Sequence, residues 1–107
     1  MLFLVQASTV RPEKIDEEAW AEVVRAECAR GQELRRAGLI RHIWRVSSDD
    51  PVLRNVGVWS ASGRTALDDA LASLPAHPWM SFAITVLEPH PLDDSYDSDI
   101  VCSLRLG

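Results

Sequence analysis

Strand-like and helix-like patterns of apolar residues alternate along the first half of the chain. Residues 2–10 are rich in apolar and β-branched side chains and are followed by Pro12, which predicts a first strand with a turn after it. Residues 12–37 instead place apolar side chains at helical spacing, with acidic residues in the first turns and basic residues in the last, which suits the helix dipole. Gly38 is expected to end this helix. Its apolar positions are Ile15, Ala19, Trp20, Val23, Val24, Leu34 and Ala37.

The second half of the chain adds a hairpin, a second helix and a last strand. Residues 39–46 and 52–59 are predicted strands, joined by the turn-forming residues 47–51. A helix that begins at Ser62 or Gly63 is predicted to run to Leu74, and residues 79–87 form a fourth strand. The resulting βαββαβ order predicts a ferredoxin-like α+β fold, in which two helices cover one face of a four-stranded antiparallel sheet.

The uncovered face of this sheet predicts self-association. Strict alternation in residues 39–46 gives two faces, one with Ile40, His42, Trp44 and Val46 and the other with Arg41, Ile43 and Arg45. Apolar side chains on the face away from the helices need a cover, and a face-to-face dimer is the simplest one. The alternating residues 100–106 predict a further short strand, which adds to a sheet edge of its own or a neighbouring subunit.

Length and charge restrict the class of protein. A chain of 107 residues with 47% hydrophobic residues supports one core, which we place in residues 1–91, followed by an acidic tail of residues 92–107. The net charge of -5 argues against nucleic acid and anionic lipid as partners. No stretch approaches the roughly 20 apolar residues of a membrane helix. Cys28 and Cys102 have no CxxC spacing, so we expect a cytoplasmic protein with reduced thiols.

Glu27 is the first candidate for chemistry. Helical counting places it on the same stripe as Trp20, Val23 and Val24, so its carboxyl group is expected to face the sheet. Burial without a partner raises the pKa of a carboxyl group, which suits a general base that removes protons from carbon. The alternative is a structural role, in which Glu27 pairs with Arg30 or with an arginine of the second strand.

The second strand carries another candidate cluster. A guanidinium group binds a carboxylate through two parallel hydrogen bonds, so Arg41 or Arg45 is suited to anchor an acidic substrate. The alternatives are ion pairs of these arginines with Glu27 or Glu33, and a structural role for His42. The histidines have no metal-ligand spacing, and the chain contains neither a nucleophile elbow nor a glycine-rich phosphate loop.

Five short segments within residues 1–91 are informative as a set. They are MLF at residues 1–3, QELRRAG at 32–38, RHIWRV at 41–46, ALDDAL at 66–71 and LPAHPWM at 74–80. In this order they resemble the segments MLFHV, QELQRxG, WRHLWRI, EALHDTL and LPLFPYM of the muconolactone isomerase family. The resemblance implies a ferredoxin-like fold, a ring-like homo-oligomer built of dimers, usually a decamer, and no metal or organic cofactor.

The resemblance also implies a reaction, the conversion of muconolactone to the enol lactone of 3-oxoadipate in catechol breakdown. A base removes the ring proton γ to the lactone carbonyl, a dienolate forms, and the proton returns at the α carbon. Glu27 matches the family's helix glutamate and is the predicted base. The predicted substrate contacts are Arg41, His42 and Arg45, which match the family's strand motif, together with Trp44 and Asn55.

The chain departs from the family pattern at several polar positions. Leu4 replaces a histidine, Cys28 a lysine and Ile40 a tryptophan, and either Leu53 or Val56 replaces a tyrosine. Loss of hydrogen-bonding groups favours a less polar substrate. The alternatives to a muconolactone isomerase are the same scaffold acting on another cyclic, chlorinated or polyketide-like substrate, and a non-catalytic oligomeric protein that binds a small molecule.

Overall fold

The computed structural model describes residues 1–93. Residues 94–107, which include the predicted strand at residues 100–106, lie outside the described part. The elements in chain order are β1 (Leu2–Thr9), α1 (Glu17–Arg36), β2 (Ile40–Val46), β3 (Leu53–Ser60), α2 (Arg64–Ala72), the short 3₁₀ helix η1 (His77–Trp79) and β4 (Met80–Leu87). The sequence pattern predicted all of these elements except η1, with ends that differ by a few residues.

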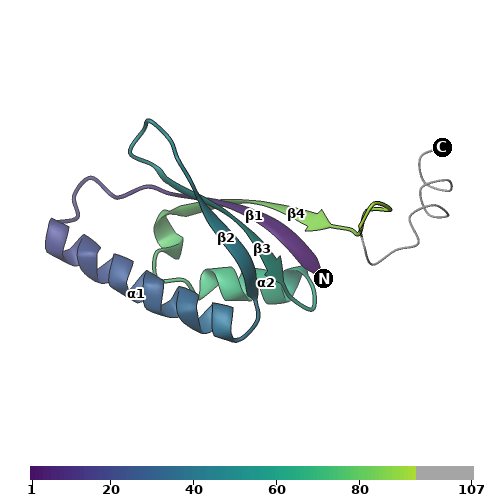
Figure 1. The fold of residues 1–107 in the computed structure, drawn as a ribbon. Coiled ribbons are helices and arrows are strands. Elements are labelled where there is room, and N and C mark those ends of the chain that lie inside the picture. The colour runs from purple at the N-terminus through teal and green to yellow at the C-terminus, as the bar shows by residue number, and fades with distance from the viewer. Residues whose placement is uncertain (94–107) are drawn as a thin grey trace.

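The four strands form one antiparallel sheet in the order β2-β3-β1-β4. The central strand β1 pairs with both β3 and β4, and β2 pairs with β3 at the edge of the sheet. Both helices lie on the same side of this sheet (Figure 1). The topology confirms the predicted ferredoxin-like α+β fold.

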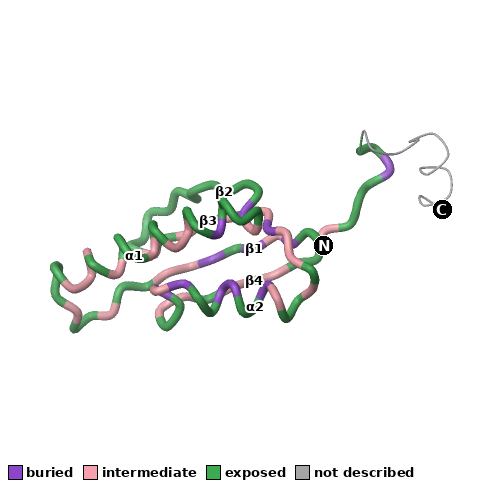
Figure 2. The backbone as a smooth tube through the Cα atoms, turned by 90° about the horizontal axis from the view of Figure 1, so that it is seen from below, coloured by how far each residue is buried: buried purple, intermediate pink, exposed green. Residues whose placement is uncertain are grey.

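The core lies between the sheet and the helices and is densest under α2. Alternate residues of β1 point toward the helices, and Phe3 and Val5 are almost fully buried there. The other buried members of the same cluster are Leu34, Ile40, Trp59, Leu67, Ala70, Leu71 and Leu74. Buried segments lie mainly on β1 and α2, whereas most of α1 is intermediate or exposed (Figure 2). The first turns of α1 therefore do not contribute to the core.

Local signals determine both ends of α1. The Asp16 carboxylate accepts a hydrogen bond of 2.7 Å from the backbone N–H of Ala19 and so caps the helix. The helix therefore begins at Glu17 rather than at Pro12 as predicted. At the other end, Gly38 adopts a φ of 86°, and its N–H and that of Leu39 bond to carbonyls of the last turn. This Schellman arrangement needs a left-handed residue, which glycine supplies without strain. Within residues 1–93, neither helix combines the length and apolar character of a membrane-spanning segment.

A β-bulge in β2 changes one prediction about its faces. The pairing of β2 with β3 shifts between Ile40 and His42, so Ile40 lies opposite Trp59 and joins the core. The prediction that Ile40 shares a face with His42 is therefore wrong, because alternation cannot reveal an extra residue in a strand. Beyond the bulge the predicted alternation holds, and Ile43 and Arg45 face the helices.

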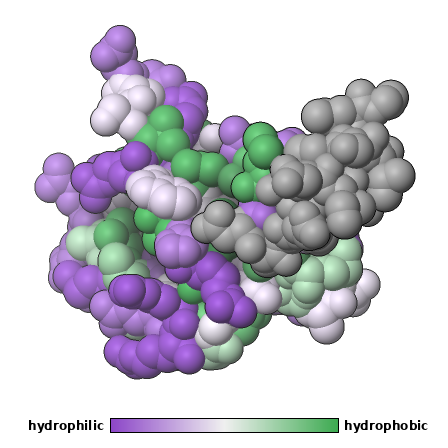
Figure 3. Space-filling model, turned by 45° about the vertical axis from the view of Figure 1, so that its right-hand side comes forward, coloured by the Kyte–Doolittle hydropathy of each residue, from purple (hydrophilic) through white to green (hydrophobic). Residues whose placement is uncertain are grey.

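The outer face of the sheet carries exposed apolar side chains. Trp44 is 55% exposed, and His42 stacks against it with ring centroids 5.8 Å apart. A shallow hollow of about 410 Å³ crosses this face, bordered by residues of all four strands. On the side of the molecule that Figure 3 presents, apolar patches lie exposed between hydrophilic groups. No helix within residues 1–93 covers this face.

Candidate active site

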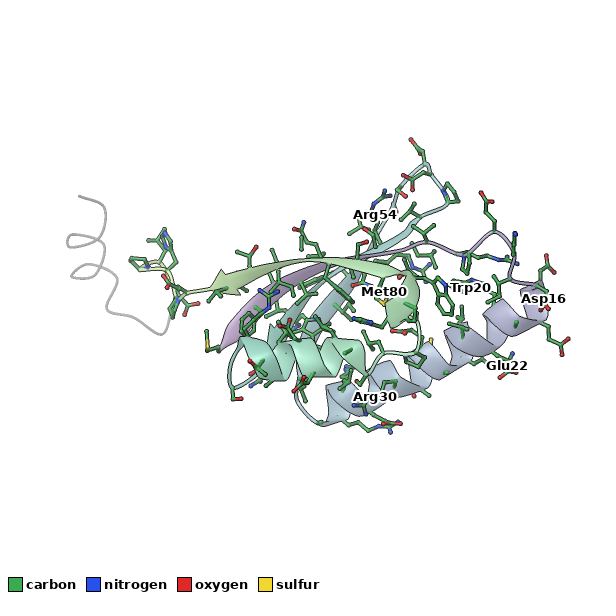
Figure 4. The ribbon with its side chains drawn as sticks, turned by 180° about the vertical axis from the view of Figure 1, so that it is seen from behind. Asp16, Trp20, Glu22, Arg30, Arg54 and Met80 are labelled. Carbon is green, nitrogen blue, oxygen red and sulfur yellow. The ribbon has the colours of Figure 1, made fainter. Side chains whose placement is uncertain are left out.

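A cleft of about 850 Å³ lies between the first turns of α1 and the helix-facing side of the sheet. The space exists because Leu34, near the C-terminal end of α1, is the residue through which this helix enters the core. Figure 4 shows Trp20 of α1 and Met80 of β4 in this region, between the helix and the strands. The cleft is lined by apolar Trp20, Val23, Val24, Ile43, Leu53 and Met80 and by polar Glu27, Arg45 and Asn55, among others.

An aromatic pair holds the start of α1 beside the cleft. Trp20 packs edge-on against Trp79 of η1, with ring centroids 5.7 Å apart and an interplanar angle of 75°. Such edge-to-face pairs contribute about 0.5–1.5 kcal/mol beyond their burial. Because η1 leads directly into β4, this contact links the first turns of the helix to the sheet.

Glu27 lies in the cleft and is held by the backbone. Its Oε1 atom accepts a hydrogen bond of 2.7 Å from the backbone N–H of Ala76, in the loop between α2 and η1. The residue is half-buried, and its carboxylate forms no ion pair within residues 1–93. Arg30 contacts Glu33 and Ser73 instead, so the alternative of a Glu27–Arg30 pair is wrong. The partner of Glu27 is instead the backbone N–H of Ala76, which the sequence analysis did not predict.

Arg45 and Asn55 lie opposite each other on β2 and β3, and both line the cleft. In the part of the chain that the structure describes, neither side chain forms a hydrogen bond or an ion pair. The predicted alternative of ion pairs to Glu27 or Glu33 is therefore not formed by Arg45. Its guanidinium group keeps all its donors and can bind a carboxylate in a bidentate manner.

Arg41 and His42 do not line the cleft. Arg41 is the extra residue of the β-bulge, and His42 lies on the outer face, stacked on Trp44. Trp44 itself borders the cleft from the edge of the sheet. Of the six residues predicted for the site, the chain thus gathers Glu27, Trp44, Arg45 and Asn55 around one cleft and leaves the other two outside it.

The loop of the β2–β3 hairpin also borders the cleft, which the sequence analysis missed. Asp50 accepts hydrogen bonds from the guanidinium of Arg54 (2.7 Å), the hydroxyl of Ser48 (2.9 Å) and the backbone N–H of Val52 (3.1 Å). The contacts with Arg54 and Ser48 lower the pKa of Asp50 from 3.8 to about 2. The contact with Asp50 also raises the pKa of Arg54. The sequence did contain a signal for the conformation of this loop, since an aspartate in a turn often accepts a hydrogen bond from the backbone N–H two residues later.

Two of the positions that depart from the family pattern line the cleft. Cys28 and Leu53 both border it, and Leu53 is 58% exposed. Leu4 instead lies on the outer face, Ile40 is in the core, and Val56 borders the outer hollow. The apolar character of the cleft is therefore set by Cys28 and Leu53 among these positions, not by Leu4 or Ile40.

The cleft brings a carboxylate, a guanidinium and an amide together among apolar side chains. A carboxylate that a backbone donor holds in place can accept and return a proton, and an unpaired guanidinium can hold an anion. Within residues 1–93, no three side chains of His, Cys, Asp or Glu are grouped so that they could hold a metal ion. The geometry suits acid–base chemistry on a small anionic molecule.

Fold and cleft together define a ferredoxin-like α+β protein with a cleft between a helix and the sheet. A sequence model of the family described as muconolactone delta-isomerase matches residues 1–93. The chain therefore belongs to the muconolactone delta-isomerase family.

Individual relatives agree with this assignment. The muconolactone delta-isomerase of Acinetobacter baylyi is 30% identical over 91 residues, which cover 85% of this chain and 92% of that protein. The enzyme of the same name from Pseudomonas putida is 31% identical over 91 residues, with 85% and 92% covered. A crystal structure of muconolactone isomerase superimposes with a TM-score of 0.80 at 30% identity, covering 91% of this chain and 98% of that one. These relatives confirm the predicted family and the predicted enzyme class, an intramolecular isomerase.

Proposed function

We propose that the protein shifts a proton within a small unsaturated lactone acid, as in the conversion of muconolactone to the enol lactone of 3-oxoadipate. One observation carries the proposal: Glu27, held by the Ala76 N–H, shares a cleft with the unpaired guanidinium of Arg45. Membership of the family supports the same reaction and a role in aromatic catabolism.

Glu27 acts first as the base and then as the acid. Its carboxylate takes the proton from the ring carbon γ to the carbonyl, and the electron pair of that C–H bond enters a dienolate. Protonated Glu27 then gives the proton to the α carbon, which forms a new C–H bond and moves the double bond from the α,β to the β,γ position. Substrate and product are isomers, so the cycle consumes neither water nor an oxidant.

The neighbours of Glu27 position the reaction. Because Oε1 is occupied by the Ala76 N–H, Oε2 is the oxygen available to the substrate. Arg45 binds the carboxylate of the lactone acid, and this contact fixes the ring relative to Glu27. Asn55, beside Arg45, donates a hydrogen bond to the lactone oxygen on which charge develops in the dienolate. Trp44 closes the rim of the cleft.

Self-association completes the proposal. A second copy covers the outer face, where Trp44 and neighbouring apolar residues are exposed, and such dimers assemble further, up to a decamer. The protein acts without a cofactor, in the cytoplasm, as the resemblance and the absence of CxxC spacing led us to expect.

A second candidate is a protein that binds lactone acids without converting them. The hydrogen bond between Glu27 and Ala76 favours it, because the same contact suits a purely structural glutamate. Turnover separates the two candidates. The test is incubation of the purified full chain with muconolactone in D₂O, followed by proton NMR. Isomerisation with partial retention of protium at the α carbon supports one base that carries the proton. Binding of the lactone without isomerisation would leave the second candidate.

A further inference from the structure

We infer that the preferred substrate is a lactone acid that carries an apolar alkyl or aryl substituent on the α or β carbon of the ring. This inference rests on the proposed isomerase function and concerns which lactones the cleft selects. The γ carbon cannot carry this additional group, because it must keep the hydrogen that Glu27 removes.

The size of the cleft is the first argument. Its volume of about 850 Å³ lies in the upper part of the range, about 300–1,000 Å³, of clefts that enclose drug-sized ligands. One five-membered ring with a carboxymethyl group fills a small part of this space. Water beside apolar walls is unfavourable compared with an apolar group in the same place. A substrate with a larger apolar part therefore uses the cleft more completely.

The distribution of polar groups is the second argument. In the proposed mechanism Arg45 binds the substrate carboxylate, and Glu27 and Asn55 contact the reacting ring. Asp50 and Arg54 of the hairpin loop also border the cleft, but their charges are paired with each other. The remaining walls include Val24, Ile43 and Leu53, which are 41%, 49% and 58% exposed. These side chains are much less buried than the core residues of the same helix and sheet, and an apolar ligand group would remove their exposed surface from water.

A series of lactone acids tests the inference. The series has the same ring and carboxymethyl group, with hydrogen, methyl, ethyl or propyl on the β carbon. We expect kcat/KM to rise about threefold to fourfold for each added carbon, the effect of burying one methylene group. Turnover of the parent lactone with kcat/KM unchanged or falling across the series would overturn the inference and leave the proposed function intact.

Two matched variants locate the effect. Leu53 and Val86 are both strand residues with exposed apolar side chains, 58% and 49% exposed, but only Leu53 is among the residues lining the cleft. Leu53→Asn should abolish most of the gain in kcat/KM with substituent length, and Val86→Asn should retain the wild-type gain. Equal behaviour of the two variants would contradict the assignment of selectivity to the cleft wall.

Binding of unreactive ligands keeps the inference separate from catalysis. Saturated lactone acids with the same substituents lack the double bond that makes the γ proton acidic, so calorimetry with wild-type protein measures affinity alone. Affinity that increases with substituent length supports the inference even if no lactone is isomerised, in which case the proposed function fails by itself. Affinity independent of substituent length overturns it.

Discussion

The carboxylate of Glu27 and the backbone N–H of Ala76 are separated by 49 positions in the sequence and meet in a hydrogen bond of 2.7 Å. The bond joins the middle of α1 to the loop that precedes η1 and β4. A charged acceptor makes such a bond stronger than one between neutral groups. The contact therefore fixes one carboxylate oxygen of the proposed base relative to the sheet.

Glu27→Gln tests the proposed base. The amide oxygen of glutamine can still accept the Ala76 N–H, but the side chain can no longer take a proton at neutral pH. We expect kcat to fall by a factor on the order of 10² to 10⁴, with little change in melting temperature or in affinity for a saturated lactone acid. Steady-state kinetics and thermal unfolding on one preparation measure these quantities.

Glu22→Gln is the matched control for that variant. Glu22 lies on the same helix, is exposed and pairs with Arg25 at the surface. Its replacement should leave kcat within about twofold, since exposed ion pairs contribute little. Full activity in a folded Glu27→Gln protein would rule out the proposed mechanism.

Arg45→Gln tests the carboxylate contact, and Arg41→Gln is its control on the same strand. Arg45 lines the cleft without a protein partner, whereas Arg41 lies at the bulge and outside the cleft. Loss of hydrogen bonds to a charged group should raise KM about 10- to 100-fold for Arg45→Gln. Arg41→Gln should change KM much less. A larger effect at Arg41 would show that the substrate lies elsewhere, for example at a surface completed by a second copy.

Asp50→Asn tests the hairpin loop that borders the cleft. The pKa of Asp50 is lowered from 3.8 to about 2, so its charged form is favoured in the folded state. The stabilisation is fully present above about pH 5, declines below the unfolded pKa of 3.8 and is lost as the pH falls through about 2. We expect the wild-type protein to melt at a higher temperature than Asp50→Asn at pH 6, with the difference becoming steadily smaller as the pH is lowered from 4 toward 2. Asp49→Asn removes a neighbouring charge, and its melting temperature relative to wild type should not show this dependence on pH. A difference in melting temperature between wild type and Asp50→Asn that does not change with pH would contradict the role assigned to the Asp50 carboxylate.

Two glycine substitutions should act in opposite directions. Gly38 has a φ of 86°, where an added Cβ is strained even though it meets no atom within 4 Å. Gly38→Ala should therefore destabilise the protein by about 1–2 kcal/mol. Gly31, in the middle of α1, also has no atom within 4 Å of an added Cβ, and Gly31→Ala should stabilise the protein by up to about 1 kcal/mol. Urea unfolding measures both changes, and the same sign for both would contradict the helix-end geometry.

Val58→Lys tests the proposed dimer through the outer face. Val58 pairs with Leu4 of β1 and His42 of β2, near the middle of that face. A lysine there should shift the protein from oligomer to monomer at micromolar concentration, because a charge cannot be buried without a partner. Light scattering measures the mass. Val86→Lys, an exposed position on the helix side of the sheet, should keep the wild-type mass. A wild-type protein that is monomeric at this concentration would contradict the proposed dimer.

Short-range patterns in the sequence were sufficient to predict the four strands, the two α-helices and part of the site. Apolar spacing placed Glu27 on the sheet-facing side of α1, and alternation placed Arg45 on the face of β2 opposite Trp44, because both follow from the backbone period of a single element. The order of the elements then restricted the fold to few topologies. These features depend on neighbours within a few residues.

Contacts between distant segments needed the tertiary structure. The bulge that turns Ile40 into the core depends on the pairing of β2 with β3. The partner of Glu27 is a backbone N–H group of a distant loop, and such a group cannot be recognised from the type of residue that carries it. The same bulge separates Arg41 from Arg45. The Asp50 loop borders the cleft only because α1 and the hairpin are brought together. The sequence by itself determined which residues share an element and, apart from the bulge in β2, which share a face, since side-chain period is local. Which of those faces meet, and therefore which polar groups share a cleft, was decided only by packing between elements.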